Sequence, residues 1–127
     1  MKKAINVVSI SVDRKLLLFR KKGVWILPGG KPEENESDQD CLLRECSEEV
    51  PGAQLEIAKF FGYFIGETPH NHSDLCAVVY LGSLTGDISP NAEIEKTSFF
   101  TKEQCGEISI SEITKKIISQ LVLKNLF

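Results

Sequence analysis

The sequence predicts an α+β domain in which a mixed β-sheet is packed between helices. Two observations support this class. Several segments rich in β-branched and aromatic residues are separated by polar turns, as strands are. Two further segments, residues 37–50 and 109–127, repeat apolar residues at helical spacing. The chain has 127 residues, of which 42% are hydrophobic, so we predict one domain with a buried core over residues 1–127.

The first part of the chain contains three predicted strands. Ala4–Val12 is apolar at neighbouring positions, as in a strand covered on both faces, although polar residues such as Asn6 interrupt it. No small-residue cleavage site follows, so we interpret this segment as a strand and not as a signal peptide. Lys15–Lys22 follows a short polar turn, which predicts a hairpin with the first strand. Gly23–Gly30 runs from a short strand into a glycine turn.

An acidic helix is predicted next, beginning near Ser37. The Ser37 hydroxyl can cap free N–H groups, and Asp38 and Asp40 suit the positive end of a helix. The helix is expected to end near Val50, because Pro51–Gly52 cannot continue it.

The second half of the chain is predicted to add strands and a last helix. Ala53–Glu67 reads as a long strand, and Leu75–Leu84 as a buried strand that returns antiparallel to it. A short strand is expected at residues 97–101. Ser109 is predicted to open the C-terminal helix, with Glu112 completing a capping box. The apolar positions expected to pack on the sheet are Ile113, Ile117 and Leu121.

Composition excludes several classes of function. The net charge is -3, with 15 basic and 18 acidic residues, so polymeric nucleic acid is not an expected partner. No apolar run approaches the ~20 residues of a membrane span, so no membrane association is expected. The 4 cysteines form no C-x-x-C pair and only 2 histidines occur, which argues against structural zinc. We therefore expect a cytoplasmic protein, monomeric or homodimeric, with cysteines as small core residues.

The acidic helix separates its residues by type. At about 100° per residue, Glu45, Glu48 and Glu49 share one face. The neighbouring stripe is apolar and is expected to be buried; it consists of Leu42, Leu43, Cys46 and Val50. The three carboxylates are therefore expected to face a cleft together.

Two readings of the three carboxylates are open. Most charge runs are solvated helix faces, and such faces usually mix charge signs at i,i+4. Glu45 and Glu49 are instead a like-charged i,i+4 pair, and a glycine turn that permits close backbone approach precedes them. Clustered carboxylates suit a hard divalent cation with oxygen ligands, so we predict a site for Mg²⁺, with Mn²⁺ as an alternative.

The spacing of these residues resembles the signature box of the Nudix hydrolases. The box has a glycine, five residues, a glutamate, seven residues, and then Arg-Glu-aliphatic-any-Glu-Glu-any-Gly. The matching positions are Gly30, Glu36, Arg44, Glu45, Glu48 and Glu49. Three positions depart from the pattern. Pro51 replaces its last glycine, Gly52 replaces the aliphatic residue that follows that glycine, and Cys46 replaces the aliphatic residue after Arg-Glu.

The resemblance implies a Nudix fold with its loop–helix–loop, and it implies roles for the matching residues. Glu45, Glu48 and Glu49 would bind the metal ion together with the Gly30 carbonyl, and these glutamates would also be catalytic. Glu36 and Arg44 would support catalysis by holding the loop–helix–loop in shape.

The implied reaction is hydrolysis of a diphosphate linkage in a derivative of a nucleoside diphosphate. The first expected substrate is a (deoxy)nucleoside triphosphate, which would give a monophosphate and pyrophosphate. The alternatives are an ADP-ribose or nucleotide-sugar pyrophosphatase, and a non-catalytic Nudix-fold module that senses a nucleotide.

Three residues outside the box are weaker candidates for contact with the substrate. Glu95 lies in a region where many Nudix enzymes carry a further carboxylate, and Glu93 is the alternative. Phe99 would contact the base or, as the structural alternative, pack in the core. His70 lies in a hydrophilic loop, where it would either contact the substrate or be solvated.

Overall fold

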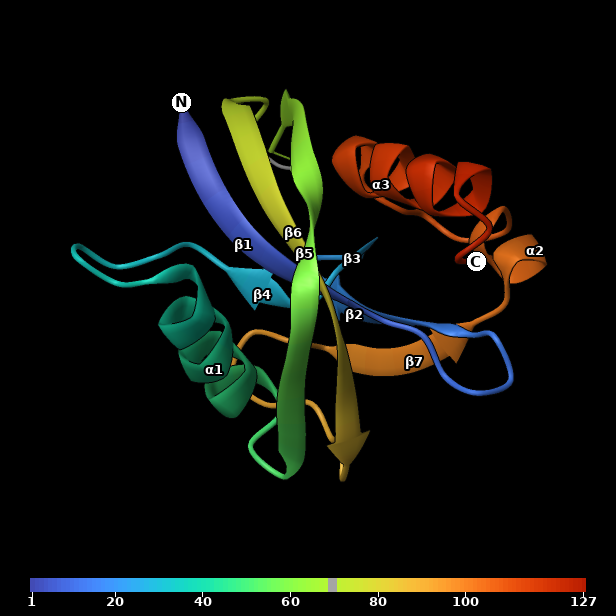
Figure 1. Cartoon of the computed structure of the whole chain (residues 1–127), viewed down its shortest axis with the longest axis horizontal. Coiled ribbons are helices and arrows are strands. Elements are labelled where there is room, and N and C mark those ends of the chain that lie inside the picture. The colour runs from blue at the N-terminus through green and yellow to red at the C-terminus, as the bar shows by residue number, and fades with distance from the viewer. Residues whose placement is uncertain (69–70) are drawn as a thin grey trace.

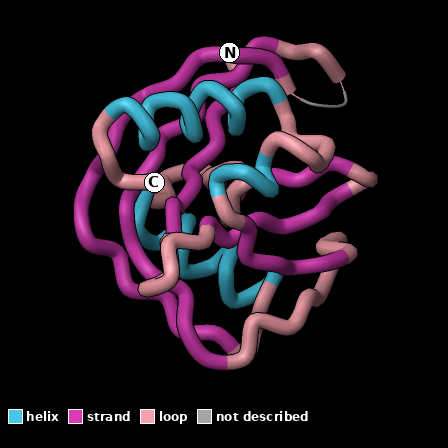
Figure 2. Tube along the Cα trace, turned by 90° about the vertical axis from the view of Figure 1, so that its right-hand side faces the viewer, coloured by secondary structure: helices cyan, strands magenta, loops and turns pink. Residues whose placement is uncertain are grey.

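The computed structural model describes residues 1–68 and 71–127, and these form a β-rich core with helices on two sides (Figure 1). The elements in chain order are β1 (Lys2–Ser9), β2 (Leu16–Lys21), β3 (Val24–Ile26), β4 (Gly29–Gly30), α1 (Asp38–Glu49), β5 (Ala53–Glu67), β6 (Asp74–Gly86), β7 (Lys96–Phe100), α2 (Lys102–Cys105) and α3 (Glu112–Leu123). Viewed from the side of α3, the strands lie between that helix and α1 (Figure 2). The predicted α+β class with a mixed sheet between helices is confirmed.

The strands form two sheets where one was expected. The larger sheet has the order β4-β1-β6-β5, with β1 parallel to β6 and the other pairs antiparallel. The smaller sheet has the order β3-β2-β7 and is antiparallel. β5 and β6 pair over most of their length, as predicted, and β5 is the outer strand of its sheet.

The predicted hairpin between the first two strands is wrong. Only the bridge between Ile10 and Leu16 joins them, and β2 then pairs with β3 and β7. The physical reason is burial, because four successive side chains of β2 are fully buried: Leu16, Leu17, Leu18 and Phe19. A strand that is apolar at every position needs cover on both faces, and the centre of the second sheet supplies it.

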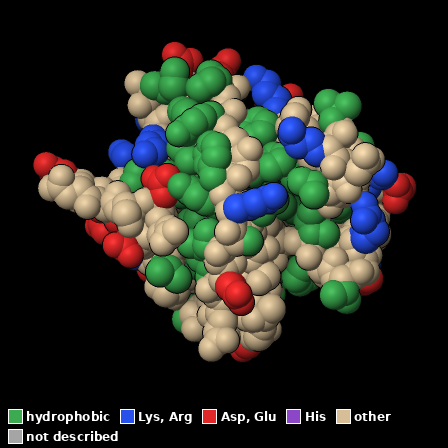
Figure 3. Space-filling view, in the orientation of Figure 1, with side chains coloured by type: hydrophobic (Ala, Val, Ile, Leu, Met, Phe, Trp, Pro, Cys, Tyr) green, Lys and Arg blue, Asp and Glu red, His purple; other side chains and the backbone are tan. Residues whose placement is uncertain are grey.

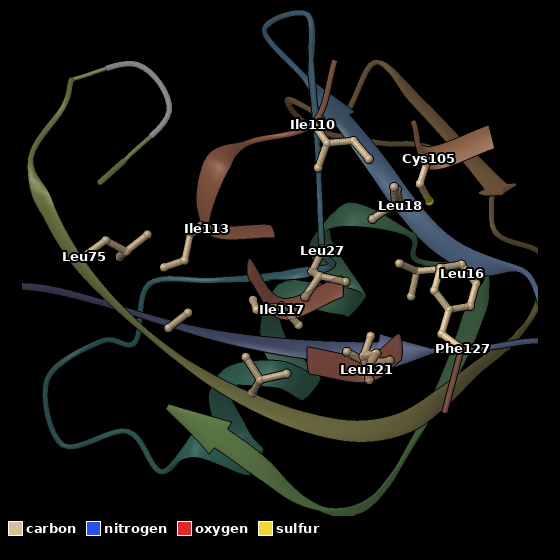
Figure 4. Packing of buried hydrophobic residues seen from close by; sticks show 13 residues of the cluster. Leu16, Leu18, Leu27, Leu75, Cys105, Ile110, Ile113, Ile117, Leu121 and Phe127 are labelled. Carbon is tan, nitrogen blue, oxygen red and sulfur yellow. The ribbon is translucent and has the colours of Figure 1, made fainter. Parts of the chain in front are cut away.

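The buried side chains form two apolar clusters on opposite faces of the sheets. One cluster lies beneath α3 and includes Leu18, Leu27 and Ile117 (Figure 4). The other lies beneath α1 and includes Leu17, Phe19 and Leu42. Alternate residues of β2 therefore stabilise both halves of the core.

Helix α1 begins and ends as predicted. The Ser37 hydroxyl accepts a hydrogen bond from Asp40 N at 3.1 Å, and Val50 is buried at the other end. The last carbonyl groups are satisfied by a loop residue, since Asn91 donates from its backbone to Glu49 O and from its side chain to Glu48 O. The carbonyl groups at the acidic end of the helix are therefore hydrogen-bonded.

The face that α1 buries is rotated from the expected one. Leu43 is 49% exposed, so its predicted burial is wrong, whereas Cys41 and Leu42 are fully buried. On a helical wheel with about 100° per residue, the buried face is centred near Glu49. This rotation places Glu49 under the helix and leaves Leu43 and Glu48 outside the contact.

The C-terminal helix starts later than predicted, because Ser111 and not Ser109 is its N-cap. Ser109 O accepts a hydrogen bond from Trp25 N at 2.9 Å, and Ser111 N donates to Trp25 O at 3.2 Å. This parallel bridge to β3 holds residues 109–111 extended, so the first free cap is the Ser111 hydroxyl, which accepts from Thr114 N. The short α2 was not predicted.

Substitution of the cap should distinguish the two serines. Ser111→Ala is expected to lower the free energy of unfolding by about 1 kcal/mol, because Thr114 N loses its partner at a buried helix end. Ser109→Ala is the control and should change it by less than about 0.5 kcal/mol, since only the backbone of Ser109 is bonded. Urea unfolding of the two variants measures the difference, and equal losses would contradict this cap assignment.

The outer strand β5 exposes apolar side chains, visible as a band across the face in Figure 3. They include Phe60, Tyr63 and Ile65, which are 45%, 70% and 53% exposed. In the part of the chain that the structure describes, no helix is long and apolar enough to cross a membrane.

Candidate active site

A pocket of about 430 Å³ lies between the larger sheet and α3. Its lining divides into two ends of different chemistry. The apolar end includes Ala4, Ile26, Leu27, Leu75, Ile113 and Ile117. The polar end includes Lys21, Lys22, Gly29, Gly30, Lys31, Glu45, Glu49 and Glu93. An apolar pocket with a few convergent polar groups is the usual form of a small-molecule site.

Two glycines let backbone and carboxylates approach closely at the polar end. Gly29 has φ +130°, and a Cβ there would lie 2.0 Å from Ile5 O. A Cβ on Gly30 would lie 2.5 Å from the Glu45 carboxyl carbon. Any side chain at Gly30 would therefore displace Glu45, so the glycine turn and the acidic helix depend on each other.

Glu49 is buried, with 4% of its surface exposed. Its Oε1 accepts a hydrogen bond from Gly29 N at 3.2 Å. Burial raises the pKa of Glu49 to about 8, and the negative charge of Glu45 acts in the same direction, against the Gly29 N–H. Burial also raises the pKa of Glu45. Burial thus disfavours the charged form of both carboxylates, and this is only partly offset by Arg44 beside Glu45 and by the Gly29 N–H beside Glu49.

Glu48 occupies a different environment. Its side chain is 54% exposed, and its Oε1 lies 3.5 Å from Nη1 of Arg44. Glu48 does not line the pocket. The expectation that three carboxylates face one pocket is therefore met by Glu45 and Glu49 only, because the rotation of α1 turns Glu48 toward solvent.

Arg44 connects the loop before α1 to the helix. Its Nε and Nη2 donate to the two oxygens of Glu36 at 2.7 and 2.9 Å, a bidentate pair. Its Nη1 donates to Glu45 at 3.0 Å, and its Nη2 also donates to Lys31 O at 3.1 Å. The hydrogen bonds from Arg44 lower the pKa of Glu36 to about 2. The guanidinium therefore fixes the loop and orients Glu45 at once.

The two pocket carboxylates fit a divalent cation. Mg²⁺ and Mn²⁺ prefer carboxylate and carbonyl oxygens, and a cation supplies the positive charge that Glu45 and Glu49 lack. Within the described residues, however, no group of three histidine, cysteine or acidic side chains is assembled for a metal ion. The ligand roles of Glu48 and of the Gly30 carbonyl therefore stay predictions from the resemblance.

Comparison with known proteins decides the family. The model of the NUDIX domain matches residues 2–121. The chain belongs to the Nudix family.

Solved structures agree with this Nudix assignment. A MutT protein from Methanosarcina mazei has a TM-score of 0.84 and 20% identity, with 98% of this chain and 94% of that chain covered. An ADP-ribose pyrophosphatase from Streptococcus suis has a TM-score of 0.69 and 25% identity, with 96% and 87% covered.

Curated Nudix relatives match over shorter stretches. The mRNA-decapping protein g5R of African swine fever virus is 34% identical over 84 residues, which covers 61% of this chain and 32% of the viral protein. The chain thus spans about a third of the length of this relative.

Of the candidates outside the Nudix box, Glu95 and Phe99 do not line the pocket. Glu95 accepts from Gly23 N at 3.1 Å and lies 3.5 Å from Arg20, so it clamps the β2–β3 turn. Phe99 packs against the core cluster beneath α1. His70 lies outside the described residues. The alternative acid, Glu93, does line the pocket and pairs with Lys21 at 3.5 Å.

Sequence reasoning missed the lysines of the Nudix pocket. Lys21 and Lys22 lie at the end of β2, and Lys31 follows the glycine turn. The doublet at the end of an apolar strand was visible in the sequence, but nothing local indicates that it meets the acidic helix. These ammonium groups give the polar end the positive charge that a phosphate chain needs.

The burial of Glu49 predicts a pH dependence of stability in metal-free protein. The pKa of this carboxyl is about 8 in the folded state and 4.5 in the unfolded state, so the folded protein keeps the proton up to a higher pH. The stability that it contributes is full below pH 4.5 and is lost as the pH rises to about 8. Urea unfolding with EDTA should show this decline, up to about 1.4 kcal/mol per pH unit. Glu49→Gln should flatten it, and an unchanged slope in that variant would contradict the assignment to Glu49.

Proposed function

We propose that the chain is a divalent-metal-dependent pyrophosphohydrolase of small nucleotides. The observation that carries the proposal is the pocket itself, which is lined by the buried Glu49, the partly buried Glu45 and three lysines together with an apolar wall. The polar end suits a diphosphate, and the apolar end suits a nucleobase. A non-catalytic sensor is disfavoured, because binding alone does not require two carboxylates buried beside an anionic ligand.

The residues have separate tasks in this proposal. Lys21, Lys22 and Lys31 hold phosphate oxygens, while Glu45 and Glu49 would hold Mg²⁺ or Mn²⁺. The cation, when bound, supplies positive charge to the phosphate oxygens. Glu49, which is buried and has a raised pKa, would take the proton of the attacking water. The water oxygen forms a new bond to phosphorus, and the bridging P–O bond breaks as the leaving group departs.

The size of the pocket favours a substrate with one nucleotide. A volume of about 430 Å³ lies toward the lower end of the range for small-molecule sites, which is roughly 300–1,000 Å³. A (deoxy)nucleoside triphosphate, cleaved to a monophosphate and pyrophosphate, is therefore our first substrate.

Other diphosphates are second candidates because of two relatives. The 25% identical ADP-ribose pyrophosphatase favours ADP-ribose or a nucleotide sugar. The viral mRNA-decapping protein favours a capped RNA end. Both substrates extend beyond one nucleotide, so they require space outside the pocket.

A substrate panel tests the proposal. Nucleoside triphosphates, ADP-ribose, a nucleotide sugar and a cap dinucleotide are each incubated with Mg²⁺, with Mn²⁺ or with EDTA, and the products are identified by mass. We expect hydrolysis of a triphosphate that requires metal and stops with EDTA. If one of the larger compounds is hydrolysed faster, that compound and not the triphosphate is the substrate. Full hydrolysis in EDTA would contradict the metal requirement. Binding without turnover across the whole panel would support the sensor.

A further inference from the structure

Asn6 is a polar residue of the pocket wall that pairs with Gly29 in the sheet and lies beside Leu27, and the site described above gives it no task. It lies on β1 between Ala4 and Val8, whose side chains face the same side of the sheet toward the α3 cluster. Asn6 lines the pocket, where its neighbours include Leu27 and Ile26. A carboxamide at an otherwise apolar position needs a hydrogen-bonding reason.

The backbone fixes which end of the Asn6 carboxamide faces the pocket. Its Nδ2 donates to Leu27 O at 3.4 Å and to Pro28 O at 3.2 Å. Two carbonyl oxygens on one side can be met only by the nitrogen, so the amide cannot be flipped without two repulsive contacts. The nitrogen is thus committed to the turn before Gly29.

The other end of the amide is an open acceptor. Among the described residues, no hydrogen bond reaches Oδ1 of Asn6, and no buried side-chain nitrogen or oxygen lacks a partner. Oδ1 is therefore accessible, and the space beside Asn6 is the pocket. An accessible carbonyl oxygen among apolar walls accepts hydrogen bonds and cannot donate them.

We propose that Asn6 determines base specificity by selecting a nucleobase with an exocyclic amino group. This inference rests on the proposed function, because it places the base in the apolar end and the phosphates at Glu45 and Glu49. An amine projects from the ring and donates to Oδ1. A keto oxygen in the same place would face Oδ1 as a second acceptor. Both oxygens would have lost their water without gaining a hydrogen bond, and a binding site disfavours such a ligand strongly.

The first test uses the unmodified protein and pairs of triphosphates that differ at one amino group. The pairs are CTP with UTP, ATP with ITP, and GTP with ITP. For each compound, kcat/KM is measured with Mg²⁺. We expect the amino member to be favoured by about 10-fold or more in at least one pair. Hydrolysis of all members without such a preference would overturn the role of Asn6 and leave the proposed function intact. Hydrolysis of none would overturn the role of Asn6 and the triphosphate as substrate, and the proposed function itself would be overturned only if the larger diphosphates of the panel also stayed intact.

Two variants then assign the preference to Oδ1. Asn6→Leu keeps the volume and removes the acceptor, so the ratio of kcat/KM within a pair should fall to about 1. The loss of the bonds to Leu27 O and Pro28 O lowers the rates of both members alike and leaves this ratio interpretable. Asn6→Asp keeps an acceptor toward the pocket and loses the two donated bonds, so the preference should remain even if stability drops. A residue that only supports the turn would lower kcat/KM for both members equally in each variant, and that result would overturn the proposal. Thermal unfolding confirms that each variant is folded when assayed.

Discussion

Replacing Glu49 with glutamine is expected to lower turnover by about 10²-fold or more while the protein stays folded. Glu49 is the most buried acidic side chain of the pocket, and its negative charge matters most when charge builds up in the transition state. The amide oxygen of glutamine can still accept the hydrogen bond from Gly29 N, so the local structure is retained. Nucleotide binding should change less than turnover, because our proposal places the base at the apolar end of the pocket, away from Glu49.

The measurement is kcat and KM with Mg²⁺, together with urea unfolding in EDTA. The variant should unfold at equal or higher urea near pH 8, because it no longer buries a charge. Glu103→Gln, on an exposed turn of α2, is the matched control and should leave kcat within about 2-fold. Unchanged turnover in Glu49→Gln would remove Glu49 from the reaction.

Glu48→Gln separates the family resemblance from the observed geometry. The resemblance predicts a loss of turnover, since Glu48 occupies a ligand position of the Nudix box. Its exposed side chain lies outside the pocket, so the observed geometry predicts unchanged turnover. A loss of turnover would support recruitment of Glu48 when the site is loaded, and unchanged turnover would support the observed geometry.

Arg44→Met is expected to destabilise the protein clearly more than the loss of an exposed ion pair would, and to remove most activity. The substitution leaves Glu36 and Glu45, whose side chains are 12% and 15% exposed, without their cation. It also releases Lys31 O, so the loop that presents Gly30 to the helix loses its anchor. Arg44→Lys keeps the charge but not the bidentate fork, and an intermediate loss is expected.

Unfolding by urea at several pH values tests this role. The pKa of Glu36 is about 2 when paired and 4.5 otherwise, so the stability from the pair is present above pH 4.5 and is lost as the pH falls toward 2. The difference between the original protein and Arg44→Met should shrink in that range. Arg20→Met, which breaks an exposed pair with Glu95, is the control and should cost less than about 1 kcal/mol. Equal losses in the two variants would show that Arg44 is an ordinary surface arginine.

Elements with a local cause were predictable from the sequence by itself. The bounds of β5 were predicted at Ala53–Glu67, and α1 begins after Ser37 and ends before Val50, as its cap and the following Pro51–Gly52 indicated. The pairing of Arg44 with Glu36 was implied by the spacing of the Nudix box. The strand and the helix depend on propensity and caps, which are properties of neighbouring residues, whereas the Arg44–Glu36 pair was implied only by the resemblance to the family.

Only the tertiary structure decided which elements meet and which side of each is covered. β2 pairs with β3 and β7 because distant strands are needed to bury both of its faces, and no local signal distinguishes that from a hairpin with β1. Ser111 replaces Ser109 as the cap because residues 109–111 bond to β3. The rotation of α1 on the sheet buries Glu49 and exposes Glu48, although the helical wheel places both on one face. A helix has its own periodicity, but the direction it faces is set by contacts with residues far away in the chain, and those contacts determined the site.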